Sequence, residues 1–410
     1  MGLRIKDKNA TAALFHKEGG VIPTGTIKLS QNGTYDVTNY AFAEIETGGE
    51  DLLDARIAGT LSGTYSNSTL SIIRKYRAFN GLNIQSIYLP QCKTIGSYVF
   101  HGYSSLTSID LPQCESINDY AFQYCYSLIS VNLPNCSYIG SGAFRSCSSL
   151  TSINLPNCTY IENSAFYSCS SLTSISLPLC SSIENYAFYN CSLLTSIDLL
   201  NCSYIGDYAF GYCSSLASIS LPICSRIESY AFVGCRSLTS ISLPNCSSIG
   251  NYAFYTCPSL TSISLPNCSS IGNYAFYYCT LLTSIDLPLC TSIGSSTFYS
   301  CRSLTSINLP LCSYIGGYTF QYCSSLTSID LPNCSYIGNY AFRYCSSLTS
   351  IYLMSTSIVS LGGSLAFRYT PMSNSTYTGT FGSIYVPSSL LASYKTKANW
   401  SYYSSRFVGI

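Results

Sequence analysis

The chain has 410 residues, only 9% of them charged, and a net charge of +1 at pH 7. Such a balance offers no basic surface to a nucleic acid or to an anionic membrane, so we expect neither as a partner. No apolar run reaches the ~20 residues of a membrane-spanning helix, and residues 1–6 lack the apolar segment of a secretory signal. We therefore expect no membrane insertion and no signal peptide in this chain.

The first 83 residues differ from the rest of the sequence. We interpret residues 1–23 as an N-terminal tail and residues 51–83 as a linker and N-terminal cap. Between them, residues 26–29 and 35–37 are rich in strand formers and flank Asn32-Gly33, a pair that favours a tight hairpin turn. Residues 24–50 are therefore predicted to form a small β-hairpin module, which is a candidate for docking to another protein.

From residue 84 to residue 347 the sequence consists of twelve repeats of 22 residues, marked by phenylalanines from Phe100 to Phe342. Each unit matches the leucine-rich-repeat pattern L-x-x-L-x-L-x-x-N/C in its first half. Alternating polar and apolar residues there predict a short strand, for example with Ile329 and Leu331 facing inward. Because one unit cannot bury its own apolar side, the units are expected to stack as a solenoid with a parallel sheet along one face.

The second half of each unit carries apolar residues at helical spacing. In the last unit, Ile337, Ala341, Phe342 and Cys345 fall at i, i+4, i+5 and i+8, which predicts a short helix on the outer side. The Gly338 column holds glutamate in three other units, so we expect it not to need a positive φ. The predicted fold class is an α/β leucine-rich-repeat solenoid with a parallel sheet on one face and short helices on the other.

The 23 cysteines occupy two columns of 22-residue period, Cys92 to Cys334 and Cys125 to Cys345. We interpret them as buried, reduced thiols that fill the core, and occasional disulfides between neighbouring units are the alternative. Cys-x-x-Cys spacing does not occur and the chain has only two histidines, so neither a metal site nor a cofactor is expected. No histidine-paired nucleophile, phosphate-binding loop or clustered carboxylate pair is present, so we do not expect an enzyme.

Two columns are candidates for recognition. On the strand, the serine column Ser108 to Ser350 is invariant and is interpreted as a structural hydroxyl ladder rather than a ligand contact. Two residues further on, an outward column of Asp, Asn and Ser lies on the face that such solenoids usually offer to ligands. Tyrosine stands two residues before Phe in nine of the twelve units, either to bind a partner or to stack on itself. The candidate binding residues are Asp110, Asn132, Asn154, Ser176, Asp198, Ser220, Asp286, Asn308, Asp330, Tyr252, Tyr274 and Tyr340.

Residues 348–410 lose the repeat register and are predicted to form a degenerate repeat and a C-terminal cap. Residues 384–387 are expected to form a last strand. Residues 388–397 are expected to form a helix that Ser388 opens. Trp400, the only tryptophan, is expected to plug the cap.

The unit L-x-x-I-x-L-P-x-C-x-x-I-G-x-x-A-F-x-x-C resembles the BspA-type leucine-rich repeats of bacterial surface proteins, and the match covers residues 84–353. The segment from Ile384 through Tyr403 is similar to the closing segment of such proteins in gut Firmicutes and their prophages. Residues 32–37 are similar to segments of phage tail-associated proteins. The resemblance implies adhesion to a protein or carbohydrate on a cell surface.

Three hypotheses follow from these observations. The first is a phage or prophage tail-associated recognition protein that binds a bacterial surface glycan or protein, with its N-terminal module docked to virion proteins. The second is a bacterial cell-surface adhesin that binds a host protein or matrix, and the third is a structural spacer. The expected location is therefore a virion or a cell surface.

Overall fold

The structure is a computed structural model that describes residues 83–373 and 379–410, together with five strands in the N-terminal part. Those strands are β1 (Thr11–Ala13), β2 (Thr26–Lys28), β3 (Tyr35–Asp36), β4 (Ser62–Ser66) and β5 (Ile72–Ile73). β2 pairs antiparallel with β1, whereas β3 pairs parallel with β4. Both segments of the predicted hairpin therefore contain strands, but these pair with other partners, and the turn at Asn32-Gly33 lies outside the described residues.

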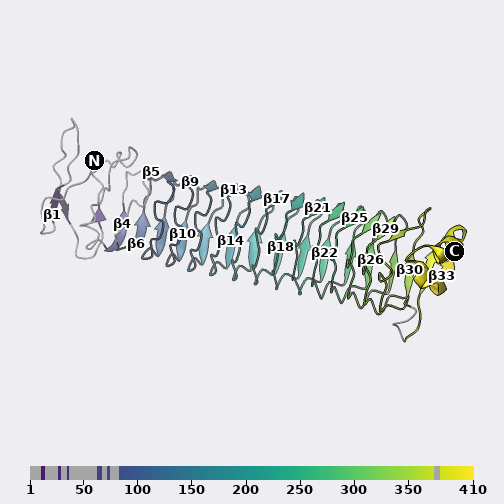
Figure 1. Cartoon of the computed structure of the whole chain (residues 1–410). Helices are drawn as coiled ribbons and strands as arrows, with labels where there is room; N and C mark the ends of the chain where they lie inside the picture. The colour runs from purple at the N-terminus through teal and green to yellow at the C-terminus, as the bar shows by residue number, and fades with distance from the viewer. Residues whose placement is uncertain are drawn as a thin grey trace. The chain divides into compact units, whose positions relative to one another are not determined.

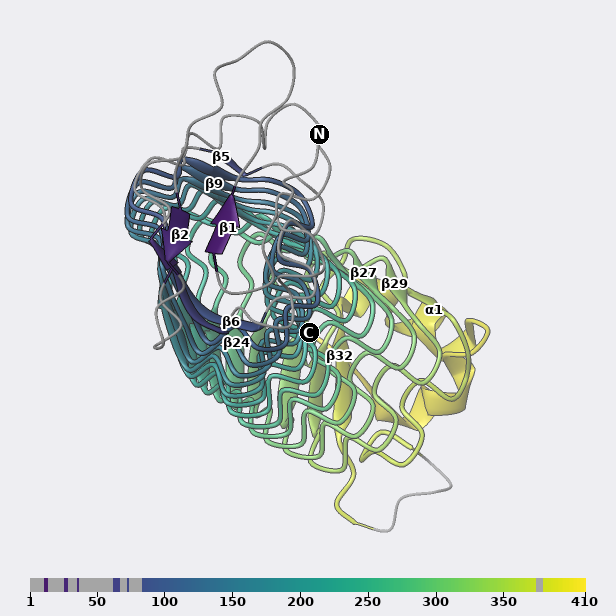
Figure 2. The same cartoon turned by 90° about the vertical axis from the view of Figure 1, so that its left-hand side faces the viewer.

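The chain divides into two compact units, residues 1–199 and 200–410. Each 22-residue coil contributes one three-residue strand, here called the front strand, and one two-residue strand, here called the back strand, and Figure 1 shows them as two separate rows. In Figure 2, the front strand β6 (Asn83–Tyr88) and the back strand β9 (Ser116–Ile117) lie on opposite sides of the coil outline.

In the first unit, the front strands after β6 are β8 (Ser108–Asp110), β10 (Ser130–Asn132), β12 (Ser152–Asn154), β14 (Ser174–Ser176) and β16 (Ser196–Asp198). The other back strands after β5 are β7 (Thr94–Ile95), β11 (Tyr138–Ile139), β13 (Tyr160–Ile161) and β15 (Ser182–Ile183). They pair in parallel with a shift of one repeat, so that Val131 lies opposite Ile153 and equivalent residues form columns. The hydrogen-bonded front sheet is interrupted between β12 and β14.

In the second unit, the front strands are β18 (Ser218–Ser220), β20 (Ser240–Ser242), β22 (Ser262–Ser264), β24 (Ser284–Asp286), β26 (Ser306–Asn308), β28 (Ser328–Asp330) and β30 (Ser350–Tyr352). The back strands are β17 (Tyr204–Ile205), β19 (Arg226–Ile227), β21 (Ser248–Ile249), β23 (Ser270–Ile271), β25 (Ser292–Ile293), β27 (Tyr314–Ile315), β29 (Tyr336–Ile337) and β31 (Ser360–Leu361). The same parallel register holds here, and the hydrogen-bonded front sheet is interrupted between β26 and β28.

The segment after each back strand is a series of turns and not the predicted short helix. The amide of Phe254 donates to the carbonyl of Ala275 in the next coil at 2.8 Å, whereas an α-helix would direct it four residues back. Tyr340 and Tyr344, on either side of Phe342, have φ of 58° and 63°. An L-residue in this left-handed region interrupts a helix, so the prediction of helices on one face is wrong. The solenoid is built from parallel strands and turns.

The core contains the predicted columns of Leu, Ile, Ala, Phe and Cys, which are buried in both units. Neighbouring Phe rings stack nearly parallel, with centroids 5.0 Å apart for Phe100 and Phe122 and 5.5 Å apart for Phe298 and Phe320. The prediction that the Gly338 column does not need a positive φ is confirmed, because the positive-φ glycines of the described residues are Gly102, Gly142 and Gly234.

All 23 cysteines are buried and carry free thiols in the structure. The two columns use these thiols differently. Cys246 Sγ donates to the carbonyl of Ser248 in its own coil at 3.2 Å. Cys257 Sγ donates to the carbonyl of Phe232 in the preceding coil, also at 3.2 Å. Each column therefore combines a small apolar side chain with a weak donor for a buried carbonyl.

The C-terminal cap follows β31 with β32 (Ser383–Val386), the 3-10 turn η2 (Ser388–Leu390), α1 (Leu391–Thr396), the 3-10 segment η3 (Ser401–Arg406) and β33 (Phe407–Gly409). The predicted strand is confirmed, although β33 and not β32 ends the sheet. The helix is shorter than predicted, and Ser388 makes no side-chain cap.

The cap supplies the backbone partners that the last coil would otherwise lack. The Trp400 indole donates to the carbonyl of Val359 at 2.7 Å, and its ring stacks on Phe367. The amide of Phe367, whose equivalents donate to a following coil, donates instead to the hydroxyl of Tyr403 at 3.2 Å. Trp400 is fully buried, as predicted. Aromatic side chains thus take the place of a further coil at this end.

Candidate functional site

The outward column of the front strands presents the predicted Asp, Asn and Ser side chains on one face of each unit. They are the third residue of each strand, and all are exposed or half-buried. An Asn next to an Asp in the adjacent coil forms a side-chain hydrogen bond. Asn132 Nδ2 donates to Asp110 Oδ1 at 2.9 Å, and Asn308 Nδ2 donates to Asp286 Oδ1 at 2.8 Å. The column is therefore a continuous polar edge in each unit, with steps of about 4.8 Å between coils.

In the first unit this face contains an open groove of about 440 Å³. Nine residues of β8, β10 and β12 line it: Ser108, Ile109, Asp110, Ser130, Val131, Asn132, Ser152, Ile153 and Asn154. Three of the predicted binding residues, Asp110, Asn132 and Asn154, thus border one hollow. The groove lies between the serine column on one side and the Asp/Asn column on the other.

The front serine column does not form the predicted hydroxyl ladder. In the part of the chain that the structure describes, none of the side chains from Ser108 to Ser350 in this column makes a hydrogen bond. The threonine one residue earlier forms the ladder instead, as when Thr261 Oγ1 donates to the carbonyl of Thr239 at 3.0 Å. The serine side chain projects from the sheet face, whereas the threonine lies beside a carbonyl of the preceding coil. The serine hydroxyls are open to solvent or a ligand.

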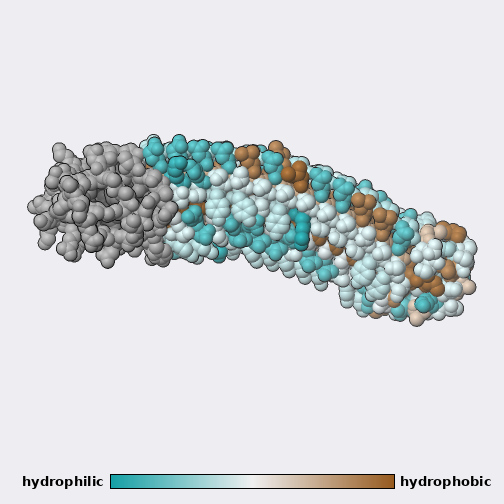
Figure 3. Space-filling view, turned by 90° about the horizontal axis from the view of Figure 1, so that it is seen from above, coloured by the Kyte–Doolittle hydropathy of each residue, from teal (hydrophilic) through white to brown (hydrophobic). Residues whose placement is uncertain are grey.

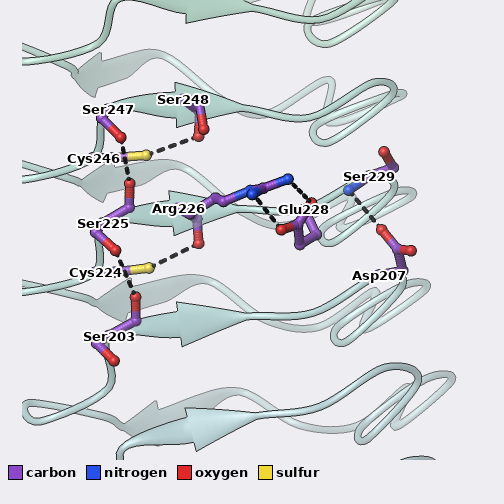
Figure 4. A network of polar contacts seen from close by, with 10 residues as sticks. All are labelled: Ser203, Asp207, Cys224, Ser225, Arg226, Glu228, Ser229, Cys246, Ser247 and Ser248. Atoms are coloured by element: carbon purple, nitrogen blue, oxygen red, sulfur yellow. Dashed lines mark hydrogen bonds and ion pairs between the residues drawn. The ribbon is translucent and has the colours of Figure 1, made fainter.

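On the back face around Arg226, several polar groups are engaged with one another (Figure 4). Arg226 Nε lies 2.6 Å from Glu228 Oε1, and the amide of Ser229 donates to Asp207 Oδ1 at 2.9 Å. The Ser225 hydroxyl donates to a carbonyl one coil earlier, and this pattern repeats along the face. An exposed ion pair of this kind contributes at most about 1 kcal/mol. The ion pair lies within one coil, whereas the contacts of Ser229 and Ser225 join neighbouring coils.

The predicted tyrosines lie in the turn segment after the back strand and not on the front face. Tyr208, Tyr230, Tyr252 and Tyr274 form one stack with ring centroids 4.4 to 4.6 Å apart, and Tyr340 stacks on Tyr318. Burial between its neighbours raises the pKa of Tyr252 above the usual range. The alternative that this column stacks on itself is confirmed, and its members expose ring edges rather than faces.

Within the described ranges, no three His, Cys, Asp or Glu side chains are grouped to hold a metal ion, and no helix has the length and apolarity to cross a membrane. Figure 3 shows separate brown patches on a mostly pale and teal surface. Leu289 and Leu311 are among the exposed apolar side chains. The front face therefore remains the candidate site, because it combines a groove with exposed Asp and Asn side chains. Sequence reasoning missed the interruptions in the tyrosine columns, although aligning the repeats displays them.

Residues 71–195, 181–289, 203–324 and 269–388 match the BspA type leucine rich repeat region. No curated protein sequence matches the chain. Among solved structures, a leucine-rich repeat protein from Bacteroides ovatus is 23% identical with a TM-score of 0.58, and the alignment covers 99% of each chain. A leucine rich cell surface protein from Faecalibacterium prausnitzii is 21% identical with a TM-score of 0.37 over 99% of each chain. The pneumococcal vaccine antigen PcpA is 17% identical with a TM-score of 0.41, over 99% of this chain and 97% of that one.

At these identities the structural similarity shows the fold alone. The family match spans residues 71–388, which is more than half of the chain, and it coincides with the stacked coils of the structure. The chain belongs to the BspA type leucine-rich-repeat family.

Proposed function

We propose that this protein is a non-enzymatic recognition protein whose front face binds a glycan or a protein on a bacterial surface. A bacterial leucine-rich-repeat protein is consistent with a protein-binding or adhesion role, and the family is typically not catalytic. The proposal adds the target and the working face to this general role.

The observation that carries the proposal is the open groove of the front face with the Asp/Asn column along it. Serine hydroxyls of the front column have no partners, and the adjacent Asp, Asn and Ser side chains are exposed or half-buried. The back strands between Ser248 and Ile293 also present unbonded serine hydroxyls, but no Asp or Asn stands on these strands. Unpaired hydroxyl, amide and carboxylate groups at a regular spacing suit a ligand with many hydroxyl or amide groups, because each coil offers one more set of hydrogen bonds.

The proposed setting is a phage or prophage tail, with the protein located on the virion and its N-terminal module docked to virion proteins. The similarity of residues 32–37 to tail-associated proteins and the similarity of the C-terminal segment to prophage-encoded relatives support this setting. A bacterial cell-surface adhesin that binds host protein or matrix is the alternative. Neighbouring genes for tail and lysis proteins favour the first setting, and an upstream start that encodes a signal peptide favours the second.

The experiment measures binding of the purified chain to whole bacterial cells and to host matrix proteins. Changing Asp286→Lys together with Asp330→Lys alters the front face in two exposed positions. The matched control is Ser248→Lys with Ser270→Lys on the back face. We expect the front-face variant to lose at least tenfold in affinity and the control to bind like the parent. Equal binding by all three proteins contradicts a role for the front face and favours the structural spacer.

A further inference from the structure

Tyrosines recur at three positions of the repeat, those of Tyr314, Tyr318 and Tyr322, and one coil of the second unit carries serine at all three. Ser292, Ser296 and Ser300 occupy positions that carry Tyr314, Tyr318 and Tyr322 in the next coil, and each of these tyrosines begins a new stack toward the C-terminus. The stacks are Tyr314 on Tyr336, Tyr318 on Tyr340, and Tyr322 on Tyr344.

At Ser296 the interruption is one coil wide and has a ring on each side. Tyr274 ends the preceding stack, and Tyr318 starts the next. Two coil steps separate these rings by about 9–10 Å. Tyr318 is 42% exposed, whereas Tyr274 is half-buried, and Ser296 at the floor is only 5% exposed. We call this space the Ser296 gap.

The neighbouring interruption at Ser300 is closed and serves as an internal comparison. There the ring of Tyr299 lies 6.1 Å from Tyr278 and 5.4 Å from Tyr322, in an edge-on arrangement with the latter. Ser300 and Ser296 are both buried, so the difference between the two interruptions lies in the rings beside them. No ring contact of this kind spans the Ser296 gap in the described part of the chain, so the facing rings of Tyr274 and Tyr318 leave room for a guest.

The chemistry at the gap is polar. In residues 270–322 the charged side chains are Asp286, on the front strand β24, and Arg302. Two coils beyond Ser296, Arg343 lies 5.3 Å from the ring of Tyr340, which stacks on Tyr318. The hydroxyl of Ser296 makes no hydrogen bond within the described residues, and neither does the hydroxyl of Tyr318. A ring with apolar faces and hydroxyl groups at its rim matches this arrangement, because its faces contact the tyrosines and its hydroxyls bond at the floor and edges.

We propose that the Ser296 gap binds one pyranose ring of a neutral glycan between Tyr274 and Tyr318. One ring in van der Waals contact with both tyrosines, at about 3.5–4.0 Å between carbons, fits between them. The unbonded hydroxyls of Ser296 and Tyr318 favour a ring that carries hydroxyl groups over an apolar aromatic ring. The inference deepens the proposed function by naming a ligand class, and it places the contact on a different side of the coil from the front face.

The test uses calorimetric titration of the full chain with neutral hexasaccharides built on glucose, mannose, galactose and N-acetylglucosamine. In the gap-filling variant Ser296→Tyr, the new ring joins the stacks on both sides, and the backbone accepts it because Ser296 has a φ of 56°, like Tyr274 and Tyr318 at 58° and 60°. Tyr318→Ser removes one wall and copies a residue that the column already contains. Ser248→Tyr, on a back strand elsewhere in the unit, is the matched control.

We expect at least one hexasaccharide to bind the parent, with a loss of at least tenfold in both gap variants and a change below twofold in the control. Thermal unfolding of Ser296→Tyr should occur at or above the parent temperature, which excludes misfolding as the cause. Failure of all four sugars to bind, or unchanged binding by Ser296→Tyr, overturns the proposal. Binding of a tryptophan-containing peptide in their place assigns the gap to a protein and also overturns it.

The two proposals fail separately. If Asp286→Lys with Asp330→Lys abolishes cell binding while Ser296→Tyr leaves it intact, the front-face function stands and the gap inference falls. If Ser296→Tyr alone abolishes binding, the gap and not the front face carries recognition.

Discussion

Raising the pH from 7 to 10 in the presence of a reductant perturbs the buried thiols directly. Burial raises the pKa of Cys136 to about 12 and that of Cys246 to about 11, from an ordinary value of 9.0. Because the folded pKa lies above the unfolded value, the contribution to stability is complete below pH 9. It is then lost as the pH rises from about 9 toward 11–12.

The magnitude follows from the number of thiols. At pH 10, one unit above the unfolded pKa, each buried thiol lowers the free energy of unfolding by about 1.4 kcal/mol. Burial raises the pKa of 19 of the cysteines. The total is therefore on the order of 25 kcal/mol at pH 10, compared with on the order of 8 kcal/mol at pH 9. Since ordinary domains have only about 5–15 kcal/mol of stability, we expect unfolding between pH 9 and 10.

Circular dichroism during an alkaline titration measures this transition. The variant Cys224→Ala with Cys246→Ala removes two titrating thiols, so its free energy of unfolding should fall less between pH 7 and pH 10, by about 3 kcal/mol. Ser240→Ala with Ser262→Ala, on the exposed front face, is the control and should keep the parent pH dependence. An identical pH dependence in the thiol variant, or a folded parent at pH 11, would refute the reasoning.

Three further predictions concern the core and the cap. Phe276→Ala should lower the free energy of unfolding by about 3–5 kcal/mol in urea titrations, because it interrupts a fully buried stack of Phe rings. Tyr278→Ala changes a ring that is 40% exposed and should lower the free energy of unfolding much less. Equal losses in the two variants contradict the stabilising role of the Phe stack. Trp400→Ala should speed hydrogen exchange of the Phe367 amide, since the indole and Phe367 pack together; unchanged exchange means that the cap does not protect the last coil. Thiol titration of the unfolded chain without reductant should count close to the 23 cysteines of the sequence, whereas a count near one indicates disulfides.

The core was predictable because its apolar residues recur periodically, and the cap because it contains the single tryptophan of the chain. A 22-residue repeat of apolar residues places Phe, Leu and Cys in columns whatever the local backbone does, and the structure buries those columns. Trp400 was identifiable because a large aromatic residue outside the repeats has few places to be buried at a solenoid end. The helix was mispredicted because turns at left-handed tyrosines produce the same apolar spacing, and tyrosine is not a residue that normally marks that conformation.

The sequence by itself determined the period, the columns and hence the family, since each of these depends only on which residues recur at fixed intervals. It also determined where the tyrosine columns are interrupted, although it did not show what an interruption creates. Only the tertiary structure decided which hydroxyls bond to a neighbouring coil and which remain open, as the contrast between Thr261 and the front serines shows. It likewise decided that Tyr299 closes one gap while Ser296 lies at the floor of another. Both outcomes depend on the direction of side chains between adjacent coils, and residues 22 positions apart become neighbours only when the coils stack.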